Sequence, residues 1–139
     1  GTTTNTVPAT ASARIDARAA TPEEQQRVDD DLRALRPRTA GASIALHGGP
    51  NRPPLPRTAS AELFERAQRI AEALTLPPLA SIEVGGGSDG NFTAGVGTPT
   101  LDGLGAVGDG AHAEGEHVVV TAMAERAALV AALIEDLRS

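Results

Sequence analysis

The sequence has no cysteine, lysine, tyrosine or tryptophan among its 139 residues. Without cysteine it can have neither a disulfide framework nor a thiolate metal site. All the positive charge is arginine, and the formal net charge is −6. That balance, with almost no aromatic side chains for base stacking, argues against nucleic-acid binding. No apolar run is long enough for a membrane span and no signal peptide is visible, so we expect a soluble, cytoplasmic protein.

Aromatic residues are almost as scarce, because Phe64 and Phe92 are the whole set. The core must therefore be built from alanine, valine, leucine and isoleucine, and alanine buries little apolar area. We expect a thin core and a chain that packs against something else. The sequence also starts at Gly1 without an initiator methionine. Either a trimmed terminus or a segment of a longer protein would explain that start.

The first part of the sequence predicts a strand, a helix and a second strand. Residues 11–19 alternate small or apolar with polar side chains, as in a half-buried strand. Thr21-Pro22-Glu23-Glu24 is typical of a capped helix start, and Pro37 ends that helix. Residues 42–47 predict the second strand, and the proline-rich stretch 48–56 a linker. We divide the chain at this linker, into residues 1–50 and 51–139.

The second part predicts alternating helices and strands, and therefore α/β layering. We expect one helix capped by Ser60 and ended by Pro77, and a last helix capped by Thr121. The apolar stripe of the last helix comprises Met123, Ala127, Val130, Ile134 and Leu137. The other expected elements are strands at 80–84, 98–104 and 118–120, a short helix at 88–97 and a glycine-rich loop at 105–115.

Three groups of residues could carry chemistry. Gly85–Asn91 follows a strand and opens a helix, so it is either a tight turn or a loop whose backbone approaches an anionic ligand. Gly108–His117 holds two histidines and three acidic residues, but its spacing matches no self-contained zinc site. Asn5 and Arg18 could bind a substrate carboxylate or could simply face water.

Three motifs in this order resemble the zinc-dependent exopeptidase and deacylase family, which includes glutamate carboxypeptidase, acetylornithine deacetylase, succinyl-diaminopimelate desuccinylase and aminoacylase. T-N-T-V-P before I-D-A-R and T-P-E-E is similar to the family's lid domain. G-G-G-S-D-G-N-F resembles its substrate-side loop. The stretch from Gly97 to Val118 resembles the one that ends in a metal-ligand histidine, with an acidic residue four positions later. Asp109 departs from the pattern, because a glycine is common there.

The resemblance implies a fold and a set of roles. Residues 51–139 would be the C-terminal part of an α/β/α catalytic domain, and residues 1–50 half of a ferredoxin-like α+β lid that dimerises. The intact enzyme would bind two zinc ions, with cobalt or manganese possible, and would cleave a small N-acyl amino acid or peptide-like substrate. The implied site residues are His112 as a metal ligand, Asn5, Arg18, Gly86, Gly87 and Ser88 at the substrate, and Asp89 and Glu116 in support.

The family's H-x-D segment, bridging aspartate and Glu-Glu pair, which includes the general base, match nothing in this sequence. We therefore expect no catalytic residue in this chain, a missing N-terminal part of the same enzyme as its partner, and no activity by itself. One alternative is a non-catalytic module that dimerises through its lid strands. Another is an anion- or nucleotide-binding domain built on Gly85–Gly90, which the missing lysine argues against.

Overall fold

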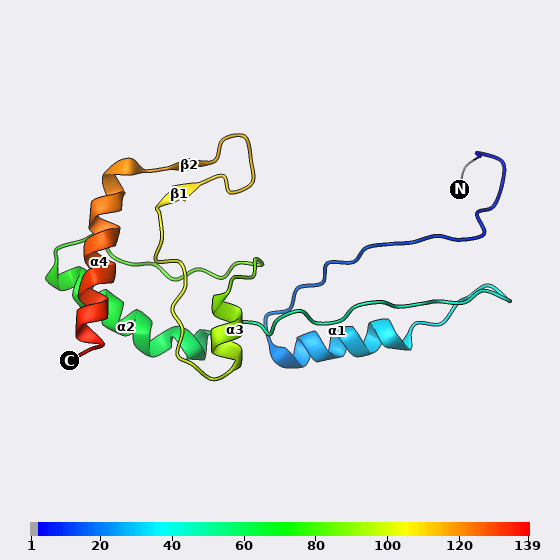
Figure 1. Ribbon diagram of the computed structural model, residues 1–139, viewed down its shortest axis with the longest axis horizontal. Helices are drawn as coiled ribbons and strands as arrows, with labels where there is room; N and C mark the ends of the chain where they lie inside the picture. Colours follow the sequence, from blue (N-terminus) through cyan, green and yellow to red (C-terminus); the bar gives the residue numbers. More distant parts are fainter. Residues whose placement is uncertain (1–2) are drawn as a thin grey trace.

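The computed structural model describes residues 3–139, and they form an elongated molecule with two parts (Figure 1). The body consists of residues 57–139, and the arm consists of residues 3–50. The elements are α1 (Pro22–Ala34), α2 (Arg57–Ala73), α3 (Gly90–Gly95), β1 (Gly108–Asp109), β2 (His117–Val118), the 3-10 helix η1 (Val120–Ala122) and α4 (Met123–Asp136). The described residues are thus mostly helical, with one small antiparallel sheet.

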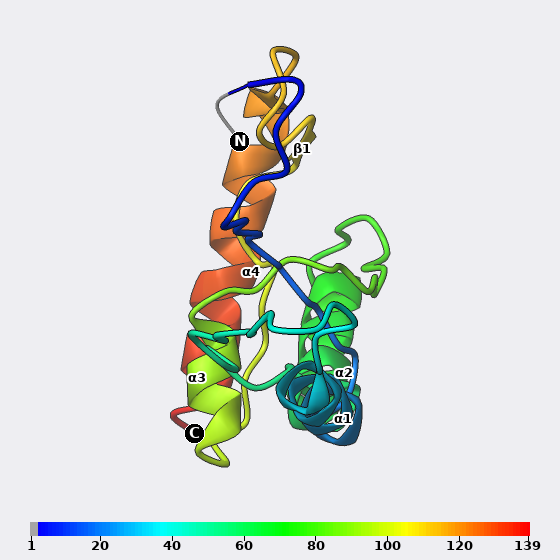
Figure 2. The ribbon, with the colours of Figure 1, turned by 90° about the vertical axis from the view of Figure 1, so that its right-hand side faces the viewer.

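The core of the body lies where α4 crosses α2 (Figures 1 and 2). The most buried apolar side chains are Ala67 and Ala71 from α2 and Leu129 and Leu133 from α4. The two alanines allow the helices to approach closely, but they remove little apolar surface from water. The thin core expected from the composition is therefore confirmed.

The start of α1 agrees with its sequence. Thr21 has extended backbone angles, and its hydroxyl accepts from the backbone N–H of Glu24 at 3.2 Å. Pro22 occupies the first turn, where its missing N–H costs nothing. The predictions of caps at Ser60 and Thr121 are wrong: α2 begins at Arg57 after Pro56, and α4 begins at Met123 after η1. Proline at the N-cap and a preceding 3-10 turn start these helices without a side-chain cap.

The last helix differs from its expected orientation. Leu129 and Leu133 are the buried side chains of α4, which contacts α2, whereas none of the predicted stripe residues is buried. Met123 and Ile134 in that stripe are each more than half exposed. Four of the five stripe residues line an open groove of about 480 Å³, together with Leu104 and Ala106. The apolar stripe is therefore only partly covered by residues 3–139.

Most of the expected strands are extended segments without a ladder. Residues 11–19, 42–47, 80–84 and 98–104 have no strand pairing within the described part of the chain. The alternation is present, since Ile82 and Val84 flank Glu83, but both apolar side chains are exposed because no strand or helix covers them. Only the expected strand at 118–120 has a counterpart, in β2. The expected α/β layering is therefore not completed within residues 3–139.

None of the helices in residues 3–139 is long and apolar enough to cross a bilayer.

Candidate carboxylate-binding site

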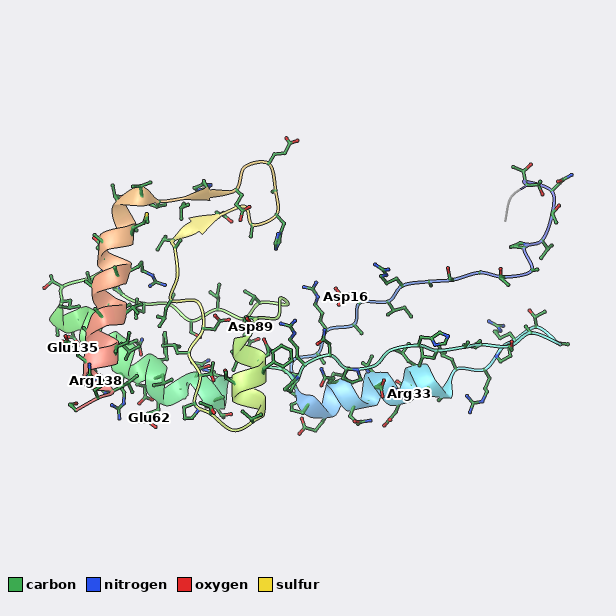
Figure 3. All side chains as sticks on the ribbon, in the orientation of Figure 1. Asp16, Arg33, Glu62, Asp89, Glu135 and Arg138 are labelled. Atoms are coloured by element: carbon green, nitrogen blue, oxygen red, sulfur yellow. The ribbon has the colours of Figure 1, made fainter. Side chains whose placement is uncertain are left out.

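The glycine loop, Gly85–Ser88, lies at the junction between the arm and the body. Arg18 reaches it from the arm: Nη1 donates to the carbonyl oxygen of Gly85 at 2.9 Å. The two residues are far apart in sequence, so the fold brings together two groups that the sequence singled out separately. In Figure 3 the side chains of Asp16 and Asp89 mark this junction.

The guanidinium of Arg18 is held from its other side by Asp16. Nε and Nη2 both donate to Oδ2 of Asp16, at 3.3 and 2.9 Å. This contact lowers the pKa of Asp16, first through the hydrogen bonds and then through the charge of Arg18. An arginine has five N–H donors, and the described bonds to Asp16 and Gly85 use three of them. Nη1 and Nη2 therefore each keep one donor for a ligand, and the side chain is 59% exposed.

The loop itself leaves room for a ligand at Gly86. A Cβ built there meets nothing within 4 Å, whereas one at Gly87 would stand 3.1 Å from Cδ of Arg52. Ser88 is half-buried, and its hydroxyl accepts from the N–H of Gly90 at 3.1 Å. Ser88 thus accepts from the first residue of α3, while Asp89, at the N-cap, makes no side-chain capping bond. The space at Gly86 is therefore open, next to the residue whose carbonyl oxygen binds Arg18.

The third residue expected at this site is not brought to it. Asn5 is exposed, and the segment 3–10 lies at the end of the long axis farthest from α2 and α4 (Figure 1). The structure therefore assembles Arg18 with the glycine loop but leaves Asn5 apart from both.

The expected metal ligand His112 lies in the exposed loop between β1 and β2. Its φ is 68°, in the left-handed region that few non-glycine residues adopt. The other histidine of this stretch, His117 in β2, bonds through Nδ1 to the carbonyl oxygen of Gly115 at 3.0 Å. Glu116, expected in support, is exposed in the same loop. Across residues 3–139 no group of three histidine, aspartate or glutamate side chains could hold a metal ion. These residues alone do not fit a dinuclear zinc centre.

Sequence reasoning missed the residues that support the glycine loop. Asn91 is 8% exposed; its Nδ2 donates to the carbonyl oxygen of Pro53 at 2.9 Å, and its Oδ1 accepts from the N–H of Ser88 at 2.8 Å. Arg52 donates to the carbonyl oxygen of Ser88 at 3.0 Å. An asparagine just inside a helix and an arginine within a proline-rich linker were the available signals.

The comparison with protein families agrees with the motifs. The model of Peptidase family M20/M25/M40 matches residues 5–136. No curated protein and no solved structure matches the chain. The family match spans nearly the whole sequence, including Arg18, the glycine loop and His112. The chain therefore belongs to peptidase family M20/M25/M40.

Proposed function

We propose that this chain supplies the carboxylate-binding part of a metal-dependent amide hydrolase, of the carboxypeptidase or N-acyl amino acid deacylase type. The observation that carries the proposal is the contact between Arg18 and Gly85, because it places a guanidinium with two remaining donors beside an open glycine backbone. Arginine forks match carboxylates in bidentate geometry. The terminal carboxylate of a small N-acyl amino acid or peptide-like substrate fits this arrangement.

We further propose that the chain is inactive alone. A metal site needs three or four ligands, and residues 3–139 offer no such group. His112 is an exposed imidazole in a loop, available to complete a site whose other ligands and general base come from additional polypeptide, the N-terminal part of the same enzyme. Two zinc ions, or cobalt or manganese, would be the metals of that complete site.

Carboxylate binding is tested with N-acetylglycine as the probe and two matched variants. Arg14 lies in the same extended segment as Arg18 but has no described hydrogen bond to the glycine loop. Titration followed by amide NMR should shift Gly85–Ser88 in the wild type and in Arg14→Ala, but not in Arg18→Ala. Equal responses from the two variants would overturn the proposed role of Arg18.

Inactivity and the metal site are tested together. The purified chain with added zinc should release no amino acid from N-acetylated amino acids, and calorimetry should show no tight zinc binding. Measurable turnover, or tight zinc binding that His112→Ala abolishes, would show that the chain completes its own site and would contradict this part of the proposal.

A second candidate function is a non-catalytic dimerisation module. The unpaired segments 11–19 and 42–47 favour it, because exposed backbone groups beside exposed apolar side chains such as Ile15 and Ile44 invite strand pairing between two copies. Sedimentation velocity separates the two candidates. A stable metal-free dimer that does not respond to N-acetylglycine would favour the module, while a dimer that binds the probe fits a lid that both dimerises and holds substrate.

A further inference from the structure

Arg52, in the linker between the arm and the body, contacts the glycine loop and the side chain of Phe92 in α3. Its Nη1 donates to the carbonyl oxygen of Ser88 at 3.0 Å. Its guanidinium carbon lies 4.8 Å from the centre of the Phe92 ring, within the range of a cation–π contact. Its aliphatic stem occupies the space beside Gly87. One side chain thus touches the segment from Gly87 to Phe92 at three points.

The backbone of the linker holds the same segment through Asn91. The side-chain amide of Asn91 bonds on one side to the carbonyl oxygen of Pro53 and on the other to the N–H of Ser88. Because the buried amide uses both its oxygen and its nitrogen, it fixes how far the loop stands from the linker. The linker therefore holds the glycine loop in two ways, through the side chain of Arg52 and through the main-chain carbonyl of Pro53.

The linker is in turn bonded to the arm. Nε2 of Gln25, on α1, donates to the backbone carbonyl oxygen of Arg52 at 2.7 Å. A continuous series of hydrogen bonds therefore runs from α1 through Arg52 to the glycine loop. Arg18, which precedes α1 on the arm, reaches the same loop at Gly85. The position of the loop relative to Arg18 thus depends on Arg52.

We infer that Arg52 is a positioning residue for the carboxylate site: it holds the glycine loop where Arg18 can share a carboxylate with it, and does not itself touch the substrate. The inference rests on the proposed function of Arg18 and the loop. Its guanidinium is turned to the protein, where it donates to the carbonyl oxygen of Ser88 and lies over the Phe92 ring. Small misplacements of the groups that hold a reactant cost large factors in rate, on the order of a hundredfold for about 1 Å.

The test compares Arg52→Gln and Arg52→Lys with the control Arg69→Gln, which removes the same single positive charge at an exposed position of α2. In the ligand-free chain, Arg52→Gln should shift and broaden the amide resonances of Gly86, Gly87 and Ser88. Arg52→Lys should restore them in part, because an ammonium keeps a charge near Phe92 and a donor for Ser88. Arg69→Gln should leave them unchanged.

The same samples are then titrated with N-acetylglycine, and Arg52→Gln should weaken its binding about tenfold or more. Phe92→Leu serves as a second variant: it removes the ring face only and should displace the same resonances by less.

Loop resonances in Arg52→Gln that stay within the spread of Arg69→Gln would overturn the inference. Changes that extend into α4 would also overturn it, because Arg52 would then be a general stabiliser. A third outcome separates the two proposals. If N-acetylglycine does not shift the loop resonances of the wild type, but Arg52→Gln shifts them in the ligand-free chain, the proposed function is contradicted and the positioning of the loop by Arg52 is supported.

Discussion

Arg66 on α2 bonds to Asp136 at the end of α4, with 3.1 Å between Nη1 and Oδ2, and it also bonds to Glu62 on its own helix through Nη2 at 3.1 Å. The pKa of Arg66 is raised first by Asp136 and then by Glu62. This pair joins the two helices of the core at the surface. Exposed ion pairs contribute little, because water screens the charges and ordering long side chains costs entropy.

We therefore expect Asp136→Asn to lower the midpoint of thermal unfolding by no more than about 5 °C. Glu135→Gln, one residue earlier and with no described ion pair, is the control and should change nothing. Circular dichroism at 222 nm measures both. A drop as large as that of a core truncation would show that the pair, rather than apolar packing, holds α4 on α2.

Truncation of the core should have a much larger effect. Leu129 is fully buried against α2, and Leu129→Ala should cost about 2–4 kcal/mol in free energy of unfolding through lost burial and the cavity left behind. Ile134→Ala, at a side chain that is 53% exposed, is the matched control and should cost well under about 1 kcal/mol. Urea unfolding measures the difference, and equal costs would mean that α4 packs through its other face.

The helix α1 should depend on pH through Glu24. Nε and Nη2 of Arg27 bond to both carboxylate oxygens of Glu24, which lowers the pKa of Glu24 below its ordinary value. A depressed folded-state pKa gives stability that is fully present above the unfolded value, about 4.3, and that is lost as pH falls through the folded value. The α-proton and carbonyl NMR shifts of α1 should therefore move toward coil values below about pH 4. Glu24→Gln should flatten part of this dependence, and an unchanged profile would contradict the assignment.

His112 should be replaceable by glycine with a gain in stability. Its φ of 68° lies in the left-handed region, which costs a non-glycine residue about 1–2 kcal/mol. His112→Gly should therefore raise the free energy of unfolding by about 1 kcal/mol, less the entropy that glycine adds to the unfolded chain. Ala111→Gly, at a position without positive φ, should lower it. Equilibrium unfolding in urea decides between these, and a loss in both variants would remove the evidence for strain at His112.

Local signals in the sequence predicted local structure well. The Thr21 cap and Pro22 start of α1 are formed as expected, because a cap and its helix lie within one turn of each other. The reciprocal half of the capping box is not formed among the described residues, since the Glu24 carboxylate accepts from Arg27. The strands failed as paired elements for a different reason. The alternation at 11–19 and 80–84 specifies a conformation and a face, but a ladder also needs a neighbour, and no neighbouring strand lies within residues 3–139.

The candidate site was predictable only in pieces. Arg18 and Gly86–Ser88 could be singled out by residue type and by resemblance, and their contact across the fold is a finding of the structure. Asn91 lies in the segment that the sequence singled out, but its role and that of Arg52 could not be assigned from sequence, because both depend on bonds between a linker and a loop that only the folded chain brings together. His112 and Asn5 remain predictions, since nothing among the described residues joins them to that site.

The unpaired stretches at 11–19 and 42–47 also bear on how long a free copy of the chain would last. Extended, exposed backbone is a preferred site of proteolytic nicking. Arg14 and Arg18 lie in the first stretch, so a protease that cleaves after arginine would detach the segment on the N-terminal side before it damaged the helical body. The rate at which proteases degrade the free chain would then be set by its arm rather than by its core. A companion polypeptide that paired these stretches would lengthen that lifetime without strengthening a single contact between α2 and α4.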